Sequence, residues 1–479
     1  MYLPGKYMIV NSVTFLVFFS VVFILFYSSR KSVKAQHWII LLSSYFFYGY
    51  ADLKMLGILI GATLLFYVLG LSVVRSKTTN KKNLLTIFGI TIGVGLLLYF
   101  KYLNFFIESF ARFFEMLGLQ TNWETFNIIM PLGISFFTFK LISYIVDVRQ
   151  GSVSADKNLV SFAAYISFFP TILSGPIDRA CNFLPQMKNP KSFDYSLAVE
   201  GCRQILWGMF KKMVIADGLS LFIQKDIETS NGSTLVIVAI FYSIQLYADF
   251  SGYSDMAIGV GKLLGFRISP NFRYPYFSQS IAEFWRRWHM SLLTWFRYYI
   301  YFPLGGSHCS KVKVIRNTFI VFLISGLWHG ANWTFVLWGL FHALLFMPSL
   351  VLERKSVKNP IDKKQPLSLR GLMSMIYVFV LVTIAWIIFR MDTVSDFWQY
   401  LGKIFSSSLF YRPEGVIWAM PAFIASLFMF AYEWYKRDVE FPLINMSSSR
   451  MKRWAIYIIL ISAVVFYQGK PAEFIYFKF

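Results

Sequence analysis

Long apolar runs without charges recur along this chain, and short polar segments separate them. Three runs without Asp, Glu, Lys or Arg are long enough to span a membrane: residues 7–29, 55–74 and 371–389. Three more uncharged runs are slightly shorter: residues 84–100, 415–432 and 454–469. A helix needs about 20 apolar residues to cross the hydrocarbon core of a bilayer, because each residue adds about 1.5 Å. The runs are far longer than the alternating strands of a membrane barrel, so the pattern predicts transmembrane helices.

Less regular runs fill the middle of the chain, with prolines, glycines and isolated charges inside them: residues 37–51, 128–148, 158–177, 201–223 and 232–248. Non-helical backbone at membrane depth is tolerated only where protein or a wet cavity surrounds it. We therefore expect broken or re-entrant helices here. The prediction is an all-α, polytopic transmembrane protein with about 11 spans, whose first apolar run is a retained span rather than a signal peptide.

Composition agrees with a membrane protein, since 57% of the 479 residues are hydrophobic and 15% are charged, against about 25% charged in soluble domains. The formal net charge is +22. No nucleic-acid recognition motif accompanies this charge, and the basic residues cluster between apolar runs, as in cytoplasmic loops. We therefore expect a lipid bilayer and no nucleic acid among the partners.

The basic loops also predict an orientation. Arg30, Lys31 and Lys34 follow the first run, and a second basic group, which includes Lys77 and Lys81, follows the third. Both groups lie on one side if the second and third runs form a hairpin, and that side is expected to be cytoplasmic. The longest polar stretch, residues 353–370, is expected there too. The amino terminus then faces outward.

Residues 317–352 form an uncharged run that is too long for one untilted span, yet it contains His329, Asn332 and His342. The chain must turn inside it, and Gly330 to Asn332 are the natural place. A histidine inside the bilayer is costly unless it finds partners, so His329 is either a functional group or a hydrogen-bonding link between two helices. His342 lies 13 residues further on, about 20 Å along a straight helix, so we expect it to pack outside the site of His329.

A second group of candidate residues mixes cations with aromatic rings: Trp285, Arg286, Arg287 and His289, followed by Trp295 and Arg297. Such a mixture suits the headgroup interface, where indole rings anchor a protein and arginines reach phosphates. It is equally consistent with an electropositive mouth that receives an anionic donor such as coenzyme A.

A third group places Asp249 and Asp255 in an otherwise apolar region. Buried carboxylates must pair or meet water, and we expect a structural ion pair with Arg273, Arg286 or Arg287. The three cysteines have no CxxC spacing, so no metal site is expected. Motifs for a nucleophilic serine elbow, a zinc protease and a nucleotide-binding loop are absent from the sequence.

Taken together, these segments resemble the membrane-bound O-acyltransferase (MBOAT) family, in its bacterial alginate and peptidoglycan O-acetyltransferase branch. The matching segments follow one another over nearly the whole chain: PLGISFFTF at 131–139, FP at 169–170 with SGP at 174–176, GMFKKMVIAD at 208–217, DFSGYSD at 249–255, FWRRWH at 284–289, GLWHGANW at 326–333 and AWIIFR at 385–390. The resemblance predicts a single membrane domain over residues 1–479. Core motifs occupy 128–390 and additional spans occupy 1–110 and 415–470.

The family resemblance implies that His329 is the catalytic histidine and that His289 is a second functional histidine. It also implies a ring of helices around a central tunnel, in a multi-pass protein of the bacterial cytoplasmic membrane. Branch members take acetyl groups from a cytoplasmic thioester, expected to be acetyl-CoA, and hold no permanent cofactor. They work with a periplasmic or surface partner of the SGNH esterase type, which acetylates a polysaccharide such as alginate, peptidoglycan or cellulose.

The chemistry expected of His329 is general-base catalysis, because a neutral imidazole can take a proton from an acceptor hydroxyl near neutral pH. Asn332, Trp328 or Trp333 could orient the ring or donate to the oxyanion. Lys211, Lys212, Arg286 and Arg287 are candidates for holding the donor's phosphates. The alternatives are D-alanyl transfer to teichoic acid and a transporter or flippase without acyl chemistry.

Overall fold

The computed structural model describes residues 8–120, 122–225, 227–351, 368–446, 449–467 and 472. Within these ranges the chain forms helices and no strands, as the all-α prediction requires. The helices pack into two compact units, one comprising Met1–Gly201 with Val260–Ser269 and the other Cys202–Gly259 with Pro270–Phe479. Most of the predicted basic loop at 353–370 lies outside the described residues.

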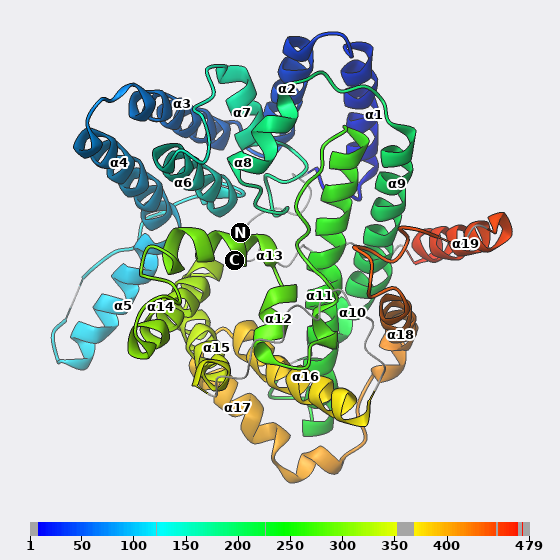
Figure 1. Cartoon of the computed structure of the whole chain (residues 1–479). Coiled ribbons are helices and arrows are strands. Elements are labelled where there is room, and N and C mark those ends of the chain that lie inside the picture. Colours follow the sequence, from blue (N-terminus) through cyan, green and yellow to red (C-terminus); the bar gives the residue numbers. More distant parts are fainter. Residues whose placement is uncertain are drawn as a thin grey trace. The chain divides into compact units, whose positions relative to one another are not determined.

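The first unit holds the helices of the amino-terminal part of the chain (Figure 1): α1 (Val13–Ser28), α2 (Val33–Ala51), α3 (Leu53–Arg75), α4 (Thr79–Leu97), the π-helical turn η1 (Leu98–Tyr102), α5 (Leu103–Met116), α6 (Ile134–Gln150), α7 (Leu159–Ser167), α8 (Ala180–Phe183) and η2 (Leu184–Met187). Polar caps start several of these helices. The hydroxyls of Ser12 and Ser32 accept backbone N–H groups at the starts of α1 and α2, and the carboxylate of Asp52 does so for α3.

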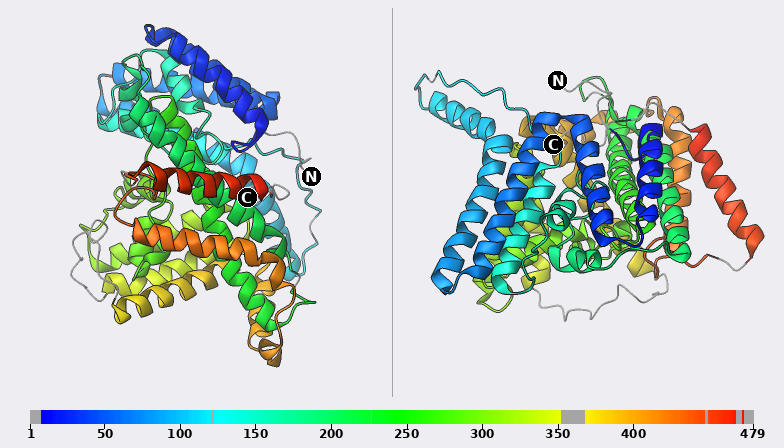
Figure 2. Two further views of the ribbon diagram at one scale, coloured as in Figure 1. Left: turned by 90° about the vertical axis from the view of Figure 1, so that its right-hand side faces the viewer. Right: turned by 90° about the horizontal axis from the view of Figure 1, so that it is seen from above.

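Consecutive helices of this unit pack against one another. Helices α2 and α3 are in contact, as the expected hairpin requires, and α3 and α4 lie side by side in Figure 2. Helix α4 also packs on α6, where a Cβ at Gly93 would come within 2.7 Å of Ile142. The glycine therefore allows this close approach.

A buried segment without regular structure follows α7. Residues 168–178 are all buried, and they include Pro170, Gly175 and Pro176. The ammonium group of Lys140 donates to Thr171 Oγ1 at 3.1 Å and to the carbonyl of Tyr165 at 3.4 Å. These hydrogen bonds give the polar groups of the segment partners that lipid could not supply. The run at 158–177 is therefore interrupted as predicted.

The second unit holds the π-helical turn η3 (Phe210–Ala216), the 3-10 turns η4 (Pro275–Phe277), η7 (Ser407–Phe410) and η8 (Val416–Ala419), the π-helical turn η5 (Arg297–Tyr301), and helices α10 (Asp217–Ile223), α12 (Ile281–Arg287), α13 (Met290–Phe296), α14 (Lys311–His329), α15 (Trp333–Val351), α16 (Leu369–Arg390), α17 (Val394–Ile404), α18 (Met420–Tyr435) and α19 (Arg450–Phe466). Helices α9 (Tyr195–Met209) and α11 (Gly232–Leu263) contribute residues to both units.

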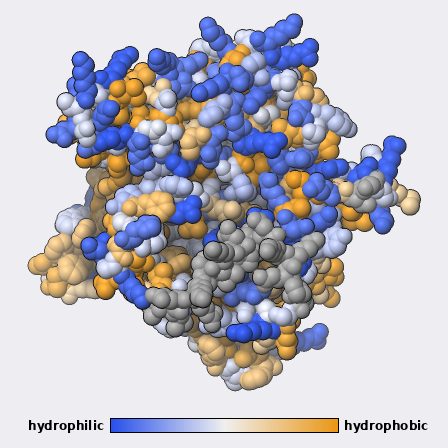
Figure 3. Space-filling view, viewed as in Figure 1, coloured by the Kyte–Doolittle hydropathy of each residue, from blue (hydrophilic) through white to orange (hydrophobic). Residues whose placement is uncertain are grey.

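Six helical stretches in the described part of the chain are long and apolar enough to cross a bilayer: Leu53–Arg75, Thr79–Met116, Gly232–Leu263, Trp333–Leu350, Leu369–Arg390 and Val416–Tyr435. Helix α1 is apolar but shorter. Large apolar side chains on the outer helices are exposed, such as Leu16 and Ile24 of α1 and Phe110 of α5, and Figure 3 shows apolar residues gathered over α5. This surface suits lipid, so the chain is a multi-pass membrane protein.

The structure corrects two of the predicted interruptions. Residues 37–51 and 232–248 lie inside the continuous helices α2 and α11. Helix α11 is instead an interior helix, since 78% of its most apolar window is buried. Its polar residues therefore meet protein rather than lipid. The run at 201–223 is interrupted as predicted, by the turn η3. The expected total of about 11 spans included runs of this kind, which the structure divides into shorter helices.

Candidate active site

Helices α14 and α15 form a tight hairpin that carries His329 at its turn (Figure 1). Two glycines face each other across the hairpin, because a Cβ at Gly326 would overlap the carbonyl oxygen of Phe335, and a Cβ at Gly339 would overlap that of Phe322. Small residues at such positions let helix backbones approach closely. The position of His329, three residues after Gly326, therefore depends on this contact.

The predicted chain reversal at residues 330–332 is confirmed. Helix α14 ends at His329 and α15 begins at Trp333. Asn332 starts α15, since its Oδ1 accepts the backbone N–H of Thr334 at 3.1 Å and its Nδ2 donates to the carbonyl of Asp392 at 2.7 Å. Asn332 thus fixes the turn that follows His329, whereas the sequence made it a candidate for orienting the ring or donating to the oxyanion.

His329 is buried, with 4% of its surface exposed. Its imidazole packs edge-on against Trp328, Trp338 and Phe389, with ring centroids 4.9, 5.1 and 5.2 Å away. Phe389 belongs to α16, so three helices fix the ring. Of the two tryptophans that the sequence placed beside His329, Trp328 is buried in this cluster and Trp333 is 55% exposed.

His289 is buried as well and has a left-handed backbone conformation, with φ 44° and ψ 52°. Such a conformation is strained for a residue with a side chain, and it persists only where the surroundings hold it. The surroundings here are polar: His289 Nδ1 lies 3.0 Å from Oδ1 of Asn271, and the Met290 N–H donates to the Asn271 carbonyl at 2.9 Å. Strained residues of this kind cluster at functional sites.

One indole joins the two histidines. The ring of Trp328 lies 5.8 Å from the ring of His289 and 4.9 Å from the ring of His329. The sequence separates the histidines by 40 positions, and the structure brings both rings into contact with one indole. We call His289, Trp328 and His329 the histidine cluster.

His342 is closer to His329 than the sequence suggested. The estimate of about 20 Å assumed one straight helix, but the turn at 330–332 folds α15 back along α14, so both imidazoles contact the Trp338 indole. His342 also packs against Trp285, at 4.9 Å between ring centroids. Neither of its ring nitrogens has a hydrogen-bond partner among the described residues. The expected separation was therefore wrong.

The predicted partners of Asp249 and Asp255 were also wrong. Lys212 Nζ lies 2.8 Å from Asp249 and 2.7 Å from Asp217, and Lys211 Nζ lies 2.5 Å from Asp255. Both lysines are buried. The turn η3 presents two consecutive lysines to α11, because a π-helical turn adds a residue that changes which side chains face a neighbour. Their charges are balanced by carboxylates, which disfavours donor-phosphate binding by these two residues.

The close approach of the end of α9 to α11, just before η3, depends on two more glycines. A Cβ at Gly208 would come within 2.6 Å of the Gly252 carbonyl, and one at Gly252 within 2.8 Å of the Gly208 carbonyl. Buried lysines and carboxylates are stable only as well-bonded pairs. The glycine contact and the ion pairs therefore act together in fixing α11.

The two adjacent arginines of the second candidate group, Arg286 and Arg287, differ in burial. Arg287 is buried and pairs with Glu283 one turn earlier in α12, at 2.6 Å, whereas Arg286 is exposed. Trp285 is buried beside His342. Among the four cations proposed for donor phosphates, Arg286 is the one with an exposed side chain, because Lys211, Lys212 and Arg287 are buried in ion pairs.

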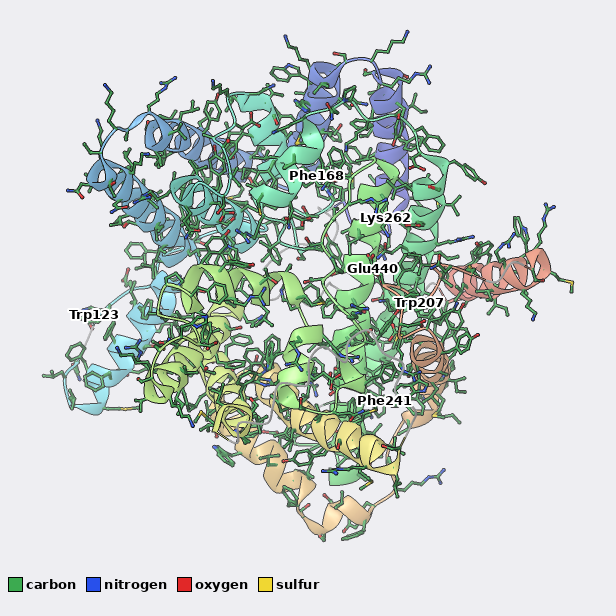
Figure 4. All side chains as sticks on the ribbon, viewed as in Figure 1. Trp123, Phe168, Trp207, Phe241, Lys262 and Glu440 are labelled. Carbon is green, nitrogen blue, oxygen red and sulfur yellow. The ribbon has the colours of Figure 1, made fainter. Side chains whose placement is uncertain are left out.

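A small polar pocket lies against the histidine cluster. Its wall contains Gln204, Ser251, Ser254, Asp255, Ile258, Pro270, Asn271, Phe272 and Glu440, and Figure 4 shows Glu440 beside α11. Asn271 belongs to both the pocket wall and the contact with His289. Gln204 Oε1 and Ser251 Oγ are buried without a hydrogen-bond partner among the described residues. The pocket can therefore accept a small hydrogen-bonding molecule such as water.

Sequence reasoning missed Asn271, Trp338 and Phe389 as neighbours of the histidines. Asn271 lies in a short polar link with no motif of its own, and the two aromatic residues look like ordinary core residues in a chain with 20% aromatic content. Their contacts depend on helix packing rather than on spacing. No cluster of His, Cys, Asp or Glu that could hold a metal ion occurs within the described residues.

Parts of this chain are similar in sequence to known proteins. The model of the membrane-bound O-acyltransferase family matches residues 152–391, a range that contains the whole histidine cluster. A probable alginate O-acetylase of Pseudomonas aeruginosa is 37% identical over 406 residues, which cover 83% of this chain and 75% of the relative. A peptidoglycan O-acetyltransferase of Helicobacter pylori is 32% identical, covering 77% and 73%. A teichoic acid D-alanyltransferase of Bacillus subtilis is 33% identical, covering 47% and 60%.

Proposed function

The chain belongs to the membrane-bound O-acyltransferase family, and on that premise we propose that it moves an acetyl group from a cytoplasmic thioester donor, acetyl-CoA, across the membrane for O-acetylation of a polysaccharide outside the cytoplasm. Relatives that match most of the chain are named for O-acetylation of alginate and of peptidoglycan. Their names support an acetyl group as the cargo and a polysaccharide as the acceptor.

The observation that carries the proposal is the histidine cluster, in which Trp328 and His329 of the uncharged run at 317–352 meet His289 at the start of α13. An ionisable residue in a membrane-spanning segment is a candidate functional group, and His329 is held by rings from α14, α15 and α16. In the proposed reaction, neutral His329 takes the proton of the acceptor hydroxyl. The hydroxyl oxygen attacks the thioester carbonyl, the thiolate leaves, and the imidazolium returns its proton to the thiolate.

The proposed donor is anionic and enters from the cytoplasm. Arg286 is the candidate for contact with its phosphates, because its guanidinium is exposed and lies on the same short helix as Trp285. Acetyl-CoA acts as a substrate in this scheme and no permanent cofactor is required. We further propose that the protein resides in the bacterial cytoplasmic membrane and works with an extracytoplasmic acetyltransferase of the SGNH esterase type.

A comparison of ester-linked acetate in cells tests this function. Wall and exopolysaccharide fractions would be purified from cells that carry the wild-type protein, the variant His329→Ala or the control His308→Ala, which changes an exposed histidine. Mild alkali then releases the acetate for measurement. We expect one polymer to lose its acetate with His329→Ala and to keep it with His308→Ala. Unchanged acetate in every fraction with His329→Ala would refute the assignment.

D-alanyl transfer is the second candidate, because the Bacillus subtilis relative also aligns with this chain. The same alkaline hydrolysate separates the two, since it would contain D-alanine in place of acetate. A transporter without acyl chemistry predicts that polymer esters do not depend on His329.

A further inference from the structure

Asn271 contacts His289 through its side chain and through its backbone. The residue is buried, with 1% of its surface exposed. Its Oδ1 lies 3.0 Å from His289 Nδ1 and accepts hydrogen bonds from the backbone N–H and the hydroxyl of Ser291, at 3.4 and 2.9 Å. Its Nδ2 donates to Ser254 Oγ at 3.2 Å. The amide therefore links α11 to the start of α13.

The Ser291 backbone fixes which way the amide points. A backbone N–H can only donate, so the Asn271 atom that faces it must be the carbonyl oxygen rather than the NH₂ group. The same oxygen faces Nδ1 of His289. An amide oxygen can only accept, so Nδ1 must carry the ring proton. In a neutral imidazole the lone pair then lies on Nε2.

The local backbone holds this arrangement in place. The Met290 N–H donates to the Asn271 carbonyl at 2.9 Å, so residues 271 and 290 are tied together beside His289. The left-handed conformation of His289 directs its ring between Phe250 and Trp328, with centroids 4.8 and 5.8 Å away. The ring can therefore not turn freely to exchange the roles of its two nitrogens.

We propose that Asn271 is a positioning residue for the acyl-transfer reaction, which holds His289 as its Nδ1–H tautomer and thereby keeps the basic Nε2 within the histidine cluster. The assignment of the His289 tautomer is independent of the proposed function, whereas the expected effect of Asn271 on acyl transfer rests on it. Partners that fix the tautomer of metal-bound histidines contribute about 10- to 100-fold to affinity or activity, and we expect an effect of the same size here.

Three substitutions test the role by activity. Asn271→Leu has a similar shape without the oxygen, Asn271→Asp keeps an acceptor oxygen toward Nδ1, and Asn83→Leu makes the same change at an exposed asparagine outside the site. In proteoliposomes that release CoA from acetyl-CoA in the presence of an acceptor polysaccharide, we expect Asn271→Leu to lose about 10- to 100-fold. Asn271→Asp should recover most of that loss, and Asn83→Leu should equal the wild type. Activity of Asn271→Leu equal to that of Asn83→Leu would overturn the role.

The tautomer itself can be measured without activity. Nitrogen-15 and carbon-13 magnetic resonance of histidine-labelled protein distinguishes Nδ1–H from Nε2–H imidazoles, and the variant His289→Gln identifies the signal of His289. We expect the Nδ1–H form in the wild type and in Asn271→Asp. An Nε2–H signal in the wild type would refute the inference even if Asn271→Leu fails to fold. If the wild type releases no CoA but shows the Nδ1–H form, the proposed function fails and the positioning stands.

Discussion

His342 is a fully buried residue, and neither of its ring nitrogens has a hydrogen-bond partner among the described residues. An unsatisfied buried polar group costs about 1–3 kcal/mol. The aromatic contacts with Trp285 and Trp338 account for its packing, and a phenylalanine could reproduce them.

The variant His342→Phe is therefore expected to unfold at the same temperature as the wild type or at a higher one, because it keeps the ring contacts and removes the unsatisfied nitrogens. Intrinsic tryptophan fluorescence during heating in detergent measures this. The matched change at the exposed His308 should have no effect. A clear decrease for His342→Phe would show that the imidazole bonds to a buried water or ligand.

Lys212 is the residue whose loss should most destabilise the second unit. Its ammonium group bonds to Asp217 at 2.7 Å and to Asp249 at 2.8 Å. Removing one member of a buried ion pair costs about 3–5 kcal/mol, because a desolvated charge remains. We expect Lys212→Met to lower the free energy of unfolding by that amount, measured by denaturant titration of tryptophan fluorescence.

Two further variants test the physical cause. Lys212→Met combined with Asp249→Asn should recover part of the loss, because one unpaired carboxylate is removed. Lys313→Met, which changes an exposed lysine of α14, should stay near the wild type. Equal stability of Lys212→Met and Lys313→Met would contradict the importance of the buried pairs.

At the scale of elements, the α14–α15 hairpin positions His329 through the contact between Gly326 and Gly339. A methyl group at Gly339 would overlap the Phe322 carbonyl, so Gly339→Ala must push the helices apart. Overpacking of this kind costs about 1–3 kcal/mol, and displacement of a reacting group by about 1 Å can cost about 100-fold in rate.

We therefore expect Gly339→Ala to lower both the unfolding temperature and the rate of CoA release. Gly402 of α17 is the matched control, since a Cβ there would meet nothing within 4 Å. Gly402→Ala should leave the rate unchanged and raise the stability slightly. A fully active Gly339→Ala protein would show that the hairpin contact does not fix His329.

The elements that the sequence predicted best are those with local signals. Gly330 and Asn332 marked the reversal before α15, and the prolines and glycines at 158–177 marked the irregular segment. The break expected at 232–248 was wrong, because α11 continues there without interruption. A helix that is buried on most sides tolerates polar residues because neighbouring helices supply their partners, and one sequence cannot reveal those partners.

The candidate site was predictable in its histidines and less so in their surroundings. His289 and His329 stood out in uncharged or aromatic segments, and the structure places both against Trp328. The partners of Asp249 and Asp255 were assigned to arginines because the spacing gave no hint of the π-helical turn η3. Asn271 was missed because it lies in the segment after α11 and His289 in the connection between α12 and α13, and these two segments meet only in the folded chain.

At the scale of the whole molecule, the charges between the helices predict the orientation in the membrane. Lys77, Lys81 and Lys82 lie at the connection between α3 and α4, whereas Lys54 lies at the start of α3, at the other end of that helix. The rule that basic loops stay in the cytoplasm places the first group inside. Lys54 then faces outward.

Single cysteines test this orientation after Cys181, Cys202 and Cys309 have been replaced by serine. A membrane-impermeant maleimide should label Lys54→Cys in intact spheroplasts and should label Lys81→Cys only in inverted vesicles. Each variant serves as the control for the other. Labelling of Lys81→Cys from outside would reverse the orientation and with it the side from which the proposed donor enters.

The most direct measurement is the rate at which purified protein in liposomes releases CoA from acetyl-CoA in the presence of an acceptor polysaccharide. The account predicts release by the wild type and by His308→Ala, and a fall to the background rate in His329→Ala with its helical content and unfolding temperature preserved. Release by His329→Ala at the wild-type rate would contradict it.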